Sequence, residues 1–242
     1  AEPNAEHLPG FGSSWRGNPP HVQPATLITS PFRRLAELRH ARVFHPDGVL
    51  CTGTASLTGD TPLPLAGGPV TARISKGIGL PGSWPDIVGL AVRLPDGSAS
   101  HWDLLLAGPA PLGGRIPLPL PSRRWVRSQV SSLTPYRHDG TLYWIRGRFL
   151  GPQDLPGLDL DRLRTAITTG SAVEVTIEVS TGTDAFVPVM HLRLDAVCTG
   201  LDVDFDPILH LPSSVDFAPE WLGSLRRKAY RGSRAGRPRS AD

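Results

Sequence analysis

The sequence predicts an α+β protein that is mainly β: an antiparallel β-barrel with peripheral helices and a C-terminal helix. Seven short runs rich in β-branched, leucine and aromatic residues are separated by PDG, GGP, PDGS, HDG and TGTD clusters, which favour tight turns. Residues 173–179 alternate apolar and polar side chains, which is typical of a half-buried antiparallel strand. Most runs follow one another without an intervening helix, which disfavours a parallel βαβ fold.

The elements are expected in the following order. Residues 1–30 are rich in Gly and Pro, lack periodicity and are expected to form a flexible arm. Residues 31–232 are expected to form one barrel domain, and residues 233–242 a solvated basic tail. Within the domain, helices are expected at 31–41, at 158–169 and from Pro219 onward, and strands at 49–57, 69–75, 87–94, 101–107, 141–150, 172–180 and 186–197.

Composition narrows the functional classes. The 242 residues carry 25 basic and 22 acidic side chains, and the net charge of +3 is weak for a nucleic-acid-binding protein. Two cysteines exclude a disulfide scaffold and a four-cysteine metal site. No apolar run reaches the ~20 residues of a membrane span, and no signal peptide is recognisable, so cytoplasm is the default expectation. The chain does not begin with Met, which is compatible with a processed terminus.

Two stretches contain candidate functional residues. In Arg42-Val43-Phe44-His45-Pro46-Asp47-Gly48, a histidine lies between an expected helix and a Pro-Asp-Gly turn. Taken alone, His45 also fits a surface histidine beside a turn. In the strand A-R-I-S, Arg73 and Ser75 are two residues apart, so their side chains should share one face.

Together these stretches resemble the haem-dependent catalase-like superfamily. The chain has R-V-F-H-P-D-G, A-R-I-S, P-D-I-V-G-L-A-V-R-L and H-W-D-L in the order and at the approximate spacing of that superfamily. The resemblance covers roughly residues 32–232 and is greatest to short, single-domain actinobacterial-type members, some of which are described as phosphodiesterases.

The resemblance implies a ferric haem b and a role for each matched residue. His45 would be the distal acid/base, and Ser75 would hydrogen-bond its imidazole and fix its tautomer. Arg42 and Arg73 would bind the haem propionates. In Arg226-Arg227-Lys228-Ala229-Tyr230, the tyrosine would ligate the iron as phenolate, and Arg226 would favour that anion. Tyr230 equally fits a helix-end tyrosine that packs on the barrel.

Two other tyrosines compete for the ligand role. Tyr143 lies in an expected strand and is expected to pack in or over the core, and Tyr136 follows a proline in an expected loop. One departure from the superfamily concerns the asparagine that orients peroxide. The run from His101 to Gly108 has no asparagine, and Ala107 or a neighbour takes its place.

The sequence therefore favours a haem-dependent oxidoreductase that acts as a peroxidase on peroxide or organic hydroperoxide rather than as a fast catalase. A non-catalytic barrel that binds haem or a lipid-like ligand is the second interpretation, and a phosphodiesterase-type hydrolase the third. The chain lacks the clustered D-x-H pairs of binuclear hydrolases, and Asp202, Asp204 and Asp206 lack the glycine and glutamate of a calcium loop. No nucleic-acid partner is expected, and a homodimer is compatible with the sequence.

Overall fold

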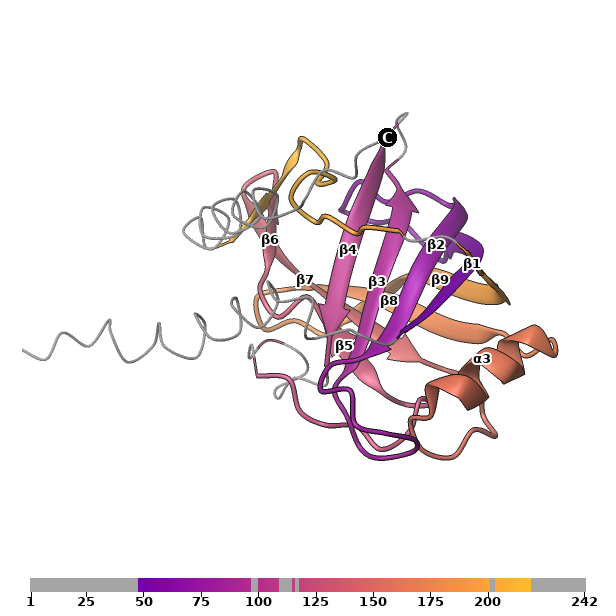
Figure 1. Cartoon of the computed structure of the whole chain (residues 1–242). Helices are drawn as coiled ribbons and strands as arrows, with labels where there is room; N and C mark the ends of the chain where they lie inside the picture. The colour runs from indigo at the N-terminus through magenta and orange to yellow at the C-terminus, as the bar shows by residue number, and fades with distance from the viewer. Residues whose placement is uncertain (1–47, 97–99, 109–114, 116–117, 201–202, 219–242) are drawn as a thin grey trace, which may run out of the picture.

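The computed structural model describes residues 48–96, 100–108, 115, 118–200 and 203–218 (Figure 1). The helix expected at 31–41, the C-terminal helix, the arm and the tail lie outside these residues. The described strands are β1 (Gly48–Leu57), β2 (Gly68–Lys76), β3 (Val88–Pro95), β4 (His101–Ala107), β5 (Gln129–Ser131), β6 (Tyr136–His138), β7 (Thr141–Phe149), β8 (Val173–Thr181), β9 (Val187–Val197) and β10 (Val215–Phe217), and one helix is described, α3 (Leu160–Thr168).

Eight of the strands close into an antiparallel barrel. The order around the sheet is β7-β5-β4-β3-β2-β1-β9-β8, and β8 pairs back with β7 to complete the ring. β6 and β10 extend the sheet beyond the first residues of β7. The predicted antiparallel barrel is confirmed, and all seven strands expected within the described residues are present.

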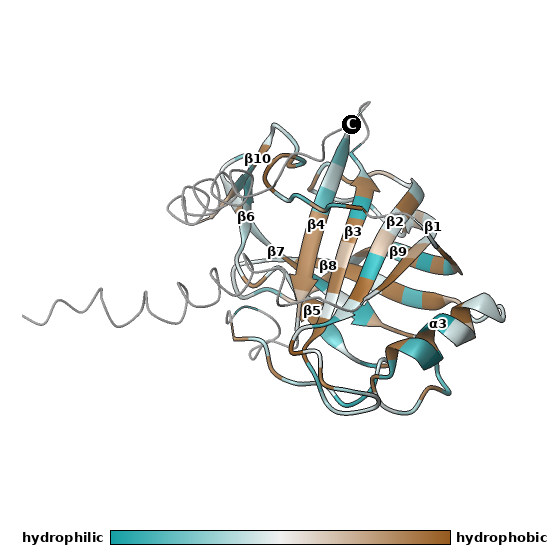
Figure 2. Ribbon diagram, in the orientation of Figure 1, coloured by the Kyte–Doolittle hydropathy of each residue, from teal (hydrophilic) through white to brown (hydrophobic). Residues whose placement is uncertain are grey.

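Alternation along the strands separates the barrel core from its outer surface (Figure 2). Inward positions are apolar and almost fully buried, and outward positions are mostly small or polar, as a sheet with one buried face requires. The inward residues of three neighbouring strands illustrate the pattern: Val70, Ala72 and Ile74 of β2, Val88, Leu90, Val92 and Leu94 of β3, and Trp102, Leu104 and Leu106 of β4.

The helix α3 was predicted from the sequence, whereas the three shortest strands were not. Asp159 caps α3 by accepting hydrogen bonds from the backbone N–H groups of Asp161 and Arg162, and Leu163 and Ile167 are the buried residues of the helix, which packs against β9 and β1. β5, β6 and β10 have three residues each and were not predicted, because so short a run shows no periodicity. No helix in the described part of the chain is long and apolar enough to cross a membrane.

Candidate functional site

The outer face of β1–β4 carries the two predicted site residues that the structure describes. Ala72 and Ile74 of β2 point into the core, so Arg73 and Ser75 lie together on the outer face. Ser75 is buried although it points outward, and Arg73 is half-buried. Arg42, His45, Arg226 and Tyr230 lie outside the described residues.

The strand register places Ser75 in a row of small residues that crosses five strands. Gly48 of β1 pairs with Ser75, Ser75 with Gly89, Gly89 with Ala107, and Ala107 with Ser131. Because directly paired residues share a face, these five positions form one outward row. None of them carries a side chain larger than a hydroxymethyl group, so the band is flat, and Ser75, Gly89 and Ser131 within it are buried.

Arg73 lies in the next row, beside that flat band. It pairs with Leu50 of β1 and Ala91 of β3, and Ala91 pairs with Leu105 of β4. The face therefore combines a strip of small groups with an adjoining apolar strip that contains the Arg73 guanidinium. Such a face suits a flat apolar ligand that carries a carboxylate.

Gly48 makes room for the stem of Arg73. A Cβ at position 48 would lie 3.0 Å from Arg73 Cγ and 3.1 Å from the carbonyl oxygen of Ile74. Gly48 is also the last residue of R-V-F-H-P-D-G, so the structure joins the first motif to the second through this contact and through the pairing of Gly48 with Ser75. The sequence alone could not show that these two motifs are neighbours.

Ala107 occupies the last position of β4 in the same row as Ser75. Its methyl group can neither donate nor accept a hydrogen bond. At this position the face therefore has no hydrogen-bonding side chain.

A charged cluster lies beside the site and was missed by the sequence analysis. The Asp103 side chain is completely buried, and both of its oxygens accept hydrogen bonds from Arg93: from Nε at 2.7 Å and from a terminal nitrogen at 2.8 Å. His210 Nδ1 lies 2.8 Å from Asp103 Oδ2, which also accepts from the backbone N–H of Asp206 at 2.9 Å. These bonds attach residues 206–210 to the outer face of β3 and β4.

The cluster is a poor metal site although His101, Asp103 and His210 place possible ligand atoms within 4.8 Å of one another. Both Asp103 oxygens already accept hydrogen bonds, and the guanidinium of Arg93 would repel a cation. Burial alone would raise the pKa of Asp103, but hydrogen bonds from Arg93, His210 and Asp206 outweigh it and lower the pKa below 3.8. Asp103 is therefore ionised, and its hydrogen bonds fix residues 206–210 to β3 and β4.

Replacing Asp103 by asparagine should lower the free energy of unfolding at neutral pH by about 3–5 kcal/mol, because it removes one partner of a buried ion pair. Because the pKa of Asp103 is lower in the folded state, its contribution is complete above its ordinary pKa and is lost as pH falls through the folded value. Urea denaturation of both proteins should therefore show a stability difference that shrinks below about pH 4. Asp216→Asn, at the exposed residue of β10, is the control; an equally small loss in both variants would contradict the assignment.

The structure describes two tyrosines, Tyr143 and Tyr136, which differ in how deeply they are buried. Tyr143 lies in β7, as predicted, and is half-buried against the core. Tyr136 begins β6 instead of lying in a loop, which corrects the prediction, and is almost fully buried with its ring 5.1 Å from Trp102 and 5.3 Å from Phe217. The aromatic packing of Tyr136 in the core argues against a role as an iron ligand on the outer face.

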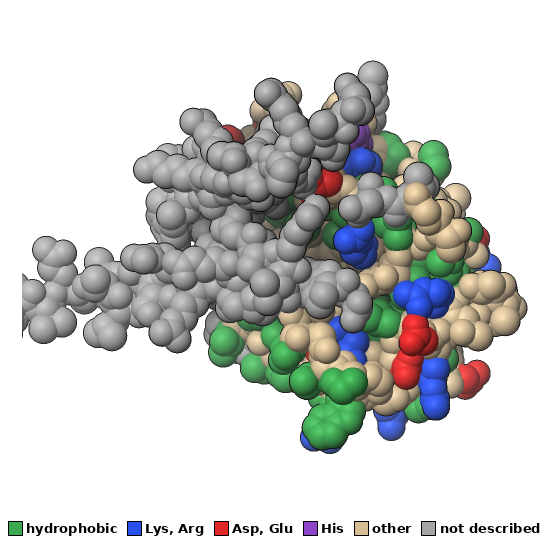
Figure 3. Space-filling model, in the orientation of Figure 1, with side chains coloured by type: hydrophobic (Ala, Val, Ile, Leu, Met, Phe, Trp, Pro, Cys, Tyr) green, Lys and Arg blue, Asp and Glu red, His purple; other side chains and the backbone are tan. Residues whose placement is uncertain are grey.

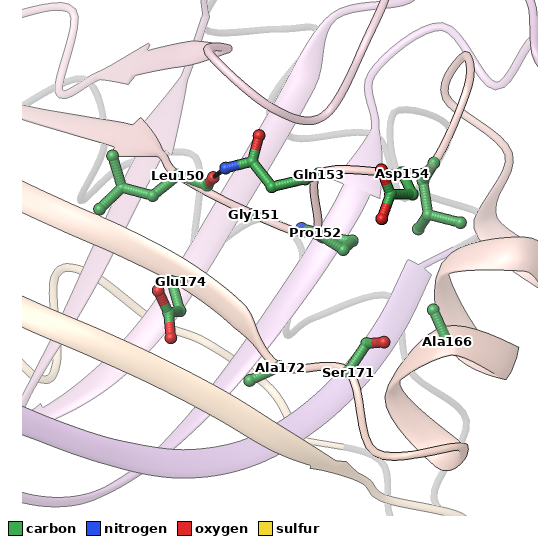
Figure 4. A pocket seen from close by; sticks show the side chains of 10 residues that line it. Leu150, Gly151, Pro152, Gln153, Asp154, Ala166, Ser171, Ala172 and Glu174 are labelled. Atoms are coloured by element: carbon green, nitrogen blue, oxygen red, sulfur yellow. Dashed lines mark hydrogen bonds between the residues drawn. The ribbon is translucent and has the colours of Figure 1, made fainter.

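A separate hollow of about 330 Å³ lies between α3 and the segments that follow β7 and precede β8 (Figure 4). Gln153, Asp154, Ser171 and Glu174 supply its polar groups, and its apolar side chains include Leu150 and Leu155. Neither Arg73 nor Ser75, the two predicted site residues that the structure describes, lines it. The hollow is therefore distinct from the outer face of β1–β4.

Comparison with known proteins identifies the fold. No protein-family model and no curated protein sequence matches the chain. Catalase A from Saccharomyces cerevisiae has a similar structure, with a TM-score of 0.56 and 13% identity over 93% of this chain and 67% of that chain. A fungal catalase is similar with a TM-score of 0.56 and 12% identity over 93% of this chain and 65% of that one. The chain thus spans about two thirds of the length of these catalases, and its fold is catalase-like.

Proposed function

We propose that this protein is a haem-binding oxidoreductase that reduces peroxides, with organic hydroperoxides preferred over hydrogen peroxide. The observation that carries the proposal is the in-register pairing of Gly48 with Ser75 on the outer face of a catalase-like barrel. This pairing joins the two motifs that resemble those of the haem-dependent superfamily. His45 precedes Gly48 by three residues, and three residues span at most about 10 Å. Because Gly48 pairs with Ser75, this length of chain allows His45 to reach the Ser75 hydroxyl.

The described residues fit a haem by shape and by charge. A porphyrin is flat and apolar and carries two carboxylates. The row from Gly48 to Ser131 has no bulky side chain that would obstruct a flat ring. The Arg73 guanidinium, one of whose terminal nitrogens lies 3.5 Å from the carbonyl oxygen of Val203, carries the paired N–H donors that bind a carboxylate best. Arg42 would contribute a second guanidinium, and the phenolate of Tyr230, favoured by Arg226 one helical turn earlier, would ligate the iron. When bound, the haem iron would supply the redox chemistry.

In this proposal the protein's own groups handle the proton. The neutral imidazole of His45 would accept a proton from one oxygen of the hydroperoxide and return it to the other oxygen, which then leaves as water or alcohol. The Ser75 hydroxyl would hydrogen-bond the imidazole and fix which ring nitrogen carries the proton. The burial of Ser75 supports this role, since a buried hydroxyl holds a fixed direction better than an exposed one.

Ala107 determines the expected substrate preference. An apolar group in the row of Ser75 cannot orient hydrogen peroxide, but it leaves room for the organic part of a hydroperoxide. The same feature favours the second candidate, a barrel that binds haem without turnover. A hydrolase finds no support among the described residues, because their one cluster of possible metal ligands has its carboxylate already hydrogen-bonded.

The kinetic test compares two substrates on the haem-loaded protein. The rate constant for hydrogen peroxide disproportionation should stay below about 10⁷ M⁻¹s⁻¹, while cumene hydroperoxide should support oxidation of a dye. Ala107→Asn restores a hydrogen-bond donor and should raise turnover of hydrogen peroxide about tenfold. Ala196→Asn, exposed on β9, should change neither rate. Catalase-like speed in the unmodified protein would contradict the preference, and haem binding without either activity would favour the non-catalytic barrel.

A further inference from the structure

The end of the barrel where β2 and β3 are joined exposes large apolar side chains. In the loop between these strands, Ile78 is 51% exposed and Trp84 is 66% exposed. In the loop that precedes β5, Leu118 is 54% and Leu120 is 42% exposed. These four are half of the eight exposed large hydrophobic residues in the described chain, and apolar side chains gather at this lower end of the molecule in Figure 3. Their concentration distinguishes them from the scattered apolar side chains of an ordinary surface.

The two loops lie side by side. Asp86 and Ser122 form an isolated antiparallel bridge, with N–H···O distances of 3.0 Å from Asp86 to Ser122 and 2.7 Å in the reverse direction. The bridge brings the residues around Trp84 next to the segment that contains Leu120. The apolar side chains of both loops therefore lie at the same end of the barrel.

Two buried ions hold the first loop rigid. The ammonium of Lys76 donates to the backbone carbonyls of Leu80 and Gly82. The carboxylate of Asp86 accepts from the backbone N–H groups of Ile78 at 2.7 Å and Leu80 at 2.8 Å. Lys76 is 3% exposed and Asp86 is fully buried. Because its backbone is fixed in this way, the loop holds Ile78 and Trp84 in water although they would be more stable if buried.

Arginines flank these apolar side chains. Arg123, Arg124 and Arg127 line an open hollow of about 340 Å³ directly after Ser122, and none of the described residues that line it is a carboxylate. All three are exposed, and among the described residues none has a side-chain hydrogen bond or an ion pair. On the other flank, Asp159 lies beside Gly82, where it caps α3. The positive charge is therefore on the side of the arginines, where nothing described neutralises it.

We propose that this end of the barrel docks on the surface of membranes that contain anionic phospholipids. The docking surface consists of Ile78, Trp84, Leu118, Leu120, Arg123, Arg124 and Arg127. Tryptophan favours the boundary between headgroups and acyl chains, and the leucine and isoleucine side chains would enter the acyl region. Arginine binds phosphate bidentately, and each adds attraction to an anionic leaflet. A second copy of this chain fits less well, because it would bring the same three positive charges against these.

Co-sedimentation with lipid vesicles tests the proposal and needs neither haem nor activity. The purified protein should bind vesicles of equal parts phosphatidylcholine and phosphatidylglycerol, should bind phosphatidylcholine vesicles much more weakly, and should be released by high salt. Each of Arg123→Ala, Arg124→Ala and Arg127→Ala should weaken binding about fivefold. Trp84→Ser should weaken it at least about tenfold, and Ile78→Ser provides a second test if Trp84→Ser does not fold.

Matched controls lie elsewhere on the barrel. Val187→Ser removes an apolar side chain that is 57% exposed, and Arg193→Ala removes an exposed arginine from β9; neither should change vesicle binding. No binding to anionic vesicles would overturn the proposal, as would equal loss in the controls. A concentration-dependent dimer that Trp84→Ser abolishes would also overturn it, because the surface would then be a protein interface.

Discussion

Replacing His45 by alanine should lower the rate constant for reaction with hydroperoxide by about 10²–10⁴ and leave the haem content unchanged. In the proposed reaction the imidazole would move the proton between the two peroxide oxygens, which the methyl group of alanine cannot do. Stopped-flow mixing of the haem-loaded protein with cumene hydroperoxide measures this rate directly. His138→Ala, at the hairpin turn between β6 and β7, is the control and should retain the unmodified rate.

The pattern of losses distinguishes a catalytic from a structural histidine. If His45→Ala loses haem and shows no kinetic defect in the fraction that remains loaded, the histidine supports the binding site instead of the reaction. If the rate is unchanged, the assignment of His45 is wrong. Ser75→Ala should reduce the rate less than His45→Ala and should shift its pH profile, because the hydroxyl would act through the imidazole.

Replacing Tyr230 by phenylalanine should remove the proposed iron ligand while retaining the aromatic ring. We expect loss of haem, or a large change in its absorption spectrum, without loss of the fold. Arg226→Leu should have a smaller effect, because the iron itself still favours the phenolate. Absorption spectra and haem-to-protein ratios of the purified variants measure both effects.

Two described tyrosines provide controls for Tyr230→Phe. Tyr143→Phe changes a half-buried ring in β7, and Tyr136→Phe changes a core ring that packs against Trp102 and Phe217. Neither substitution should alter the spectrum of bound haem. An unchanged spectrum in Tyr230→Phe would place the ligand on another residue and contradict the proximal half of the proposal.

Much of the fold follows from local sequence because the long strands carry their own signal. The run from Val173 to Val179 alternates clearly, and turn clusters separate the other long strands. The three-residue strands β5, β6 and β10 carry no such signal. The ring closes by pairing β7 with β8, two strands that α3 separates in the chain, and no local pattern encodes this pairing.

The sequence could predict individual residues of the candidate site, but it could not predict which residues of other strands lie beside them. The spacing of Arg73 and Ser75 shows that they share a face, but a one-residue change in register would move every partner to the other face. The row from Gly48 through Ser75, Gly89 and Ala107 therefore appears only once the strands are paired. The contact of His210 with Asp103 joins residues 107 positions apart, beyond the reach of any sequence pattern.

If the outer face of β1–β4 binds haem, as we propose, the absorption spectrum of protein from haem-supplemented cells should show it. We expect a Soret band and about one haem per chain. Gly48→Ala, whose Cβ would lie 3.0 Å from Arg73 Cγ, should lower the haem-to-protein ratio, whereas Gly59→Ala, with nothing within 4 Å of its Cβ, should retain the unmodified ratio. Protein that never takes up haem, or a ratio that Gly48→Ala leaves unchanged, would contradict haem binding at this face.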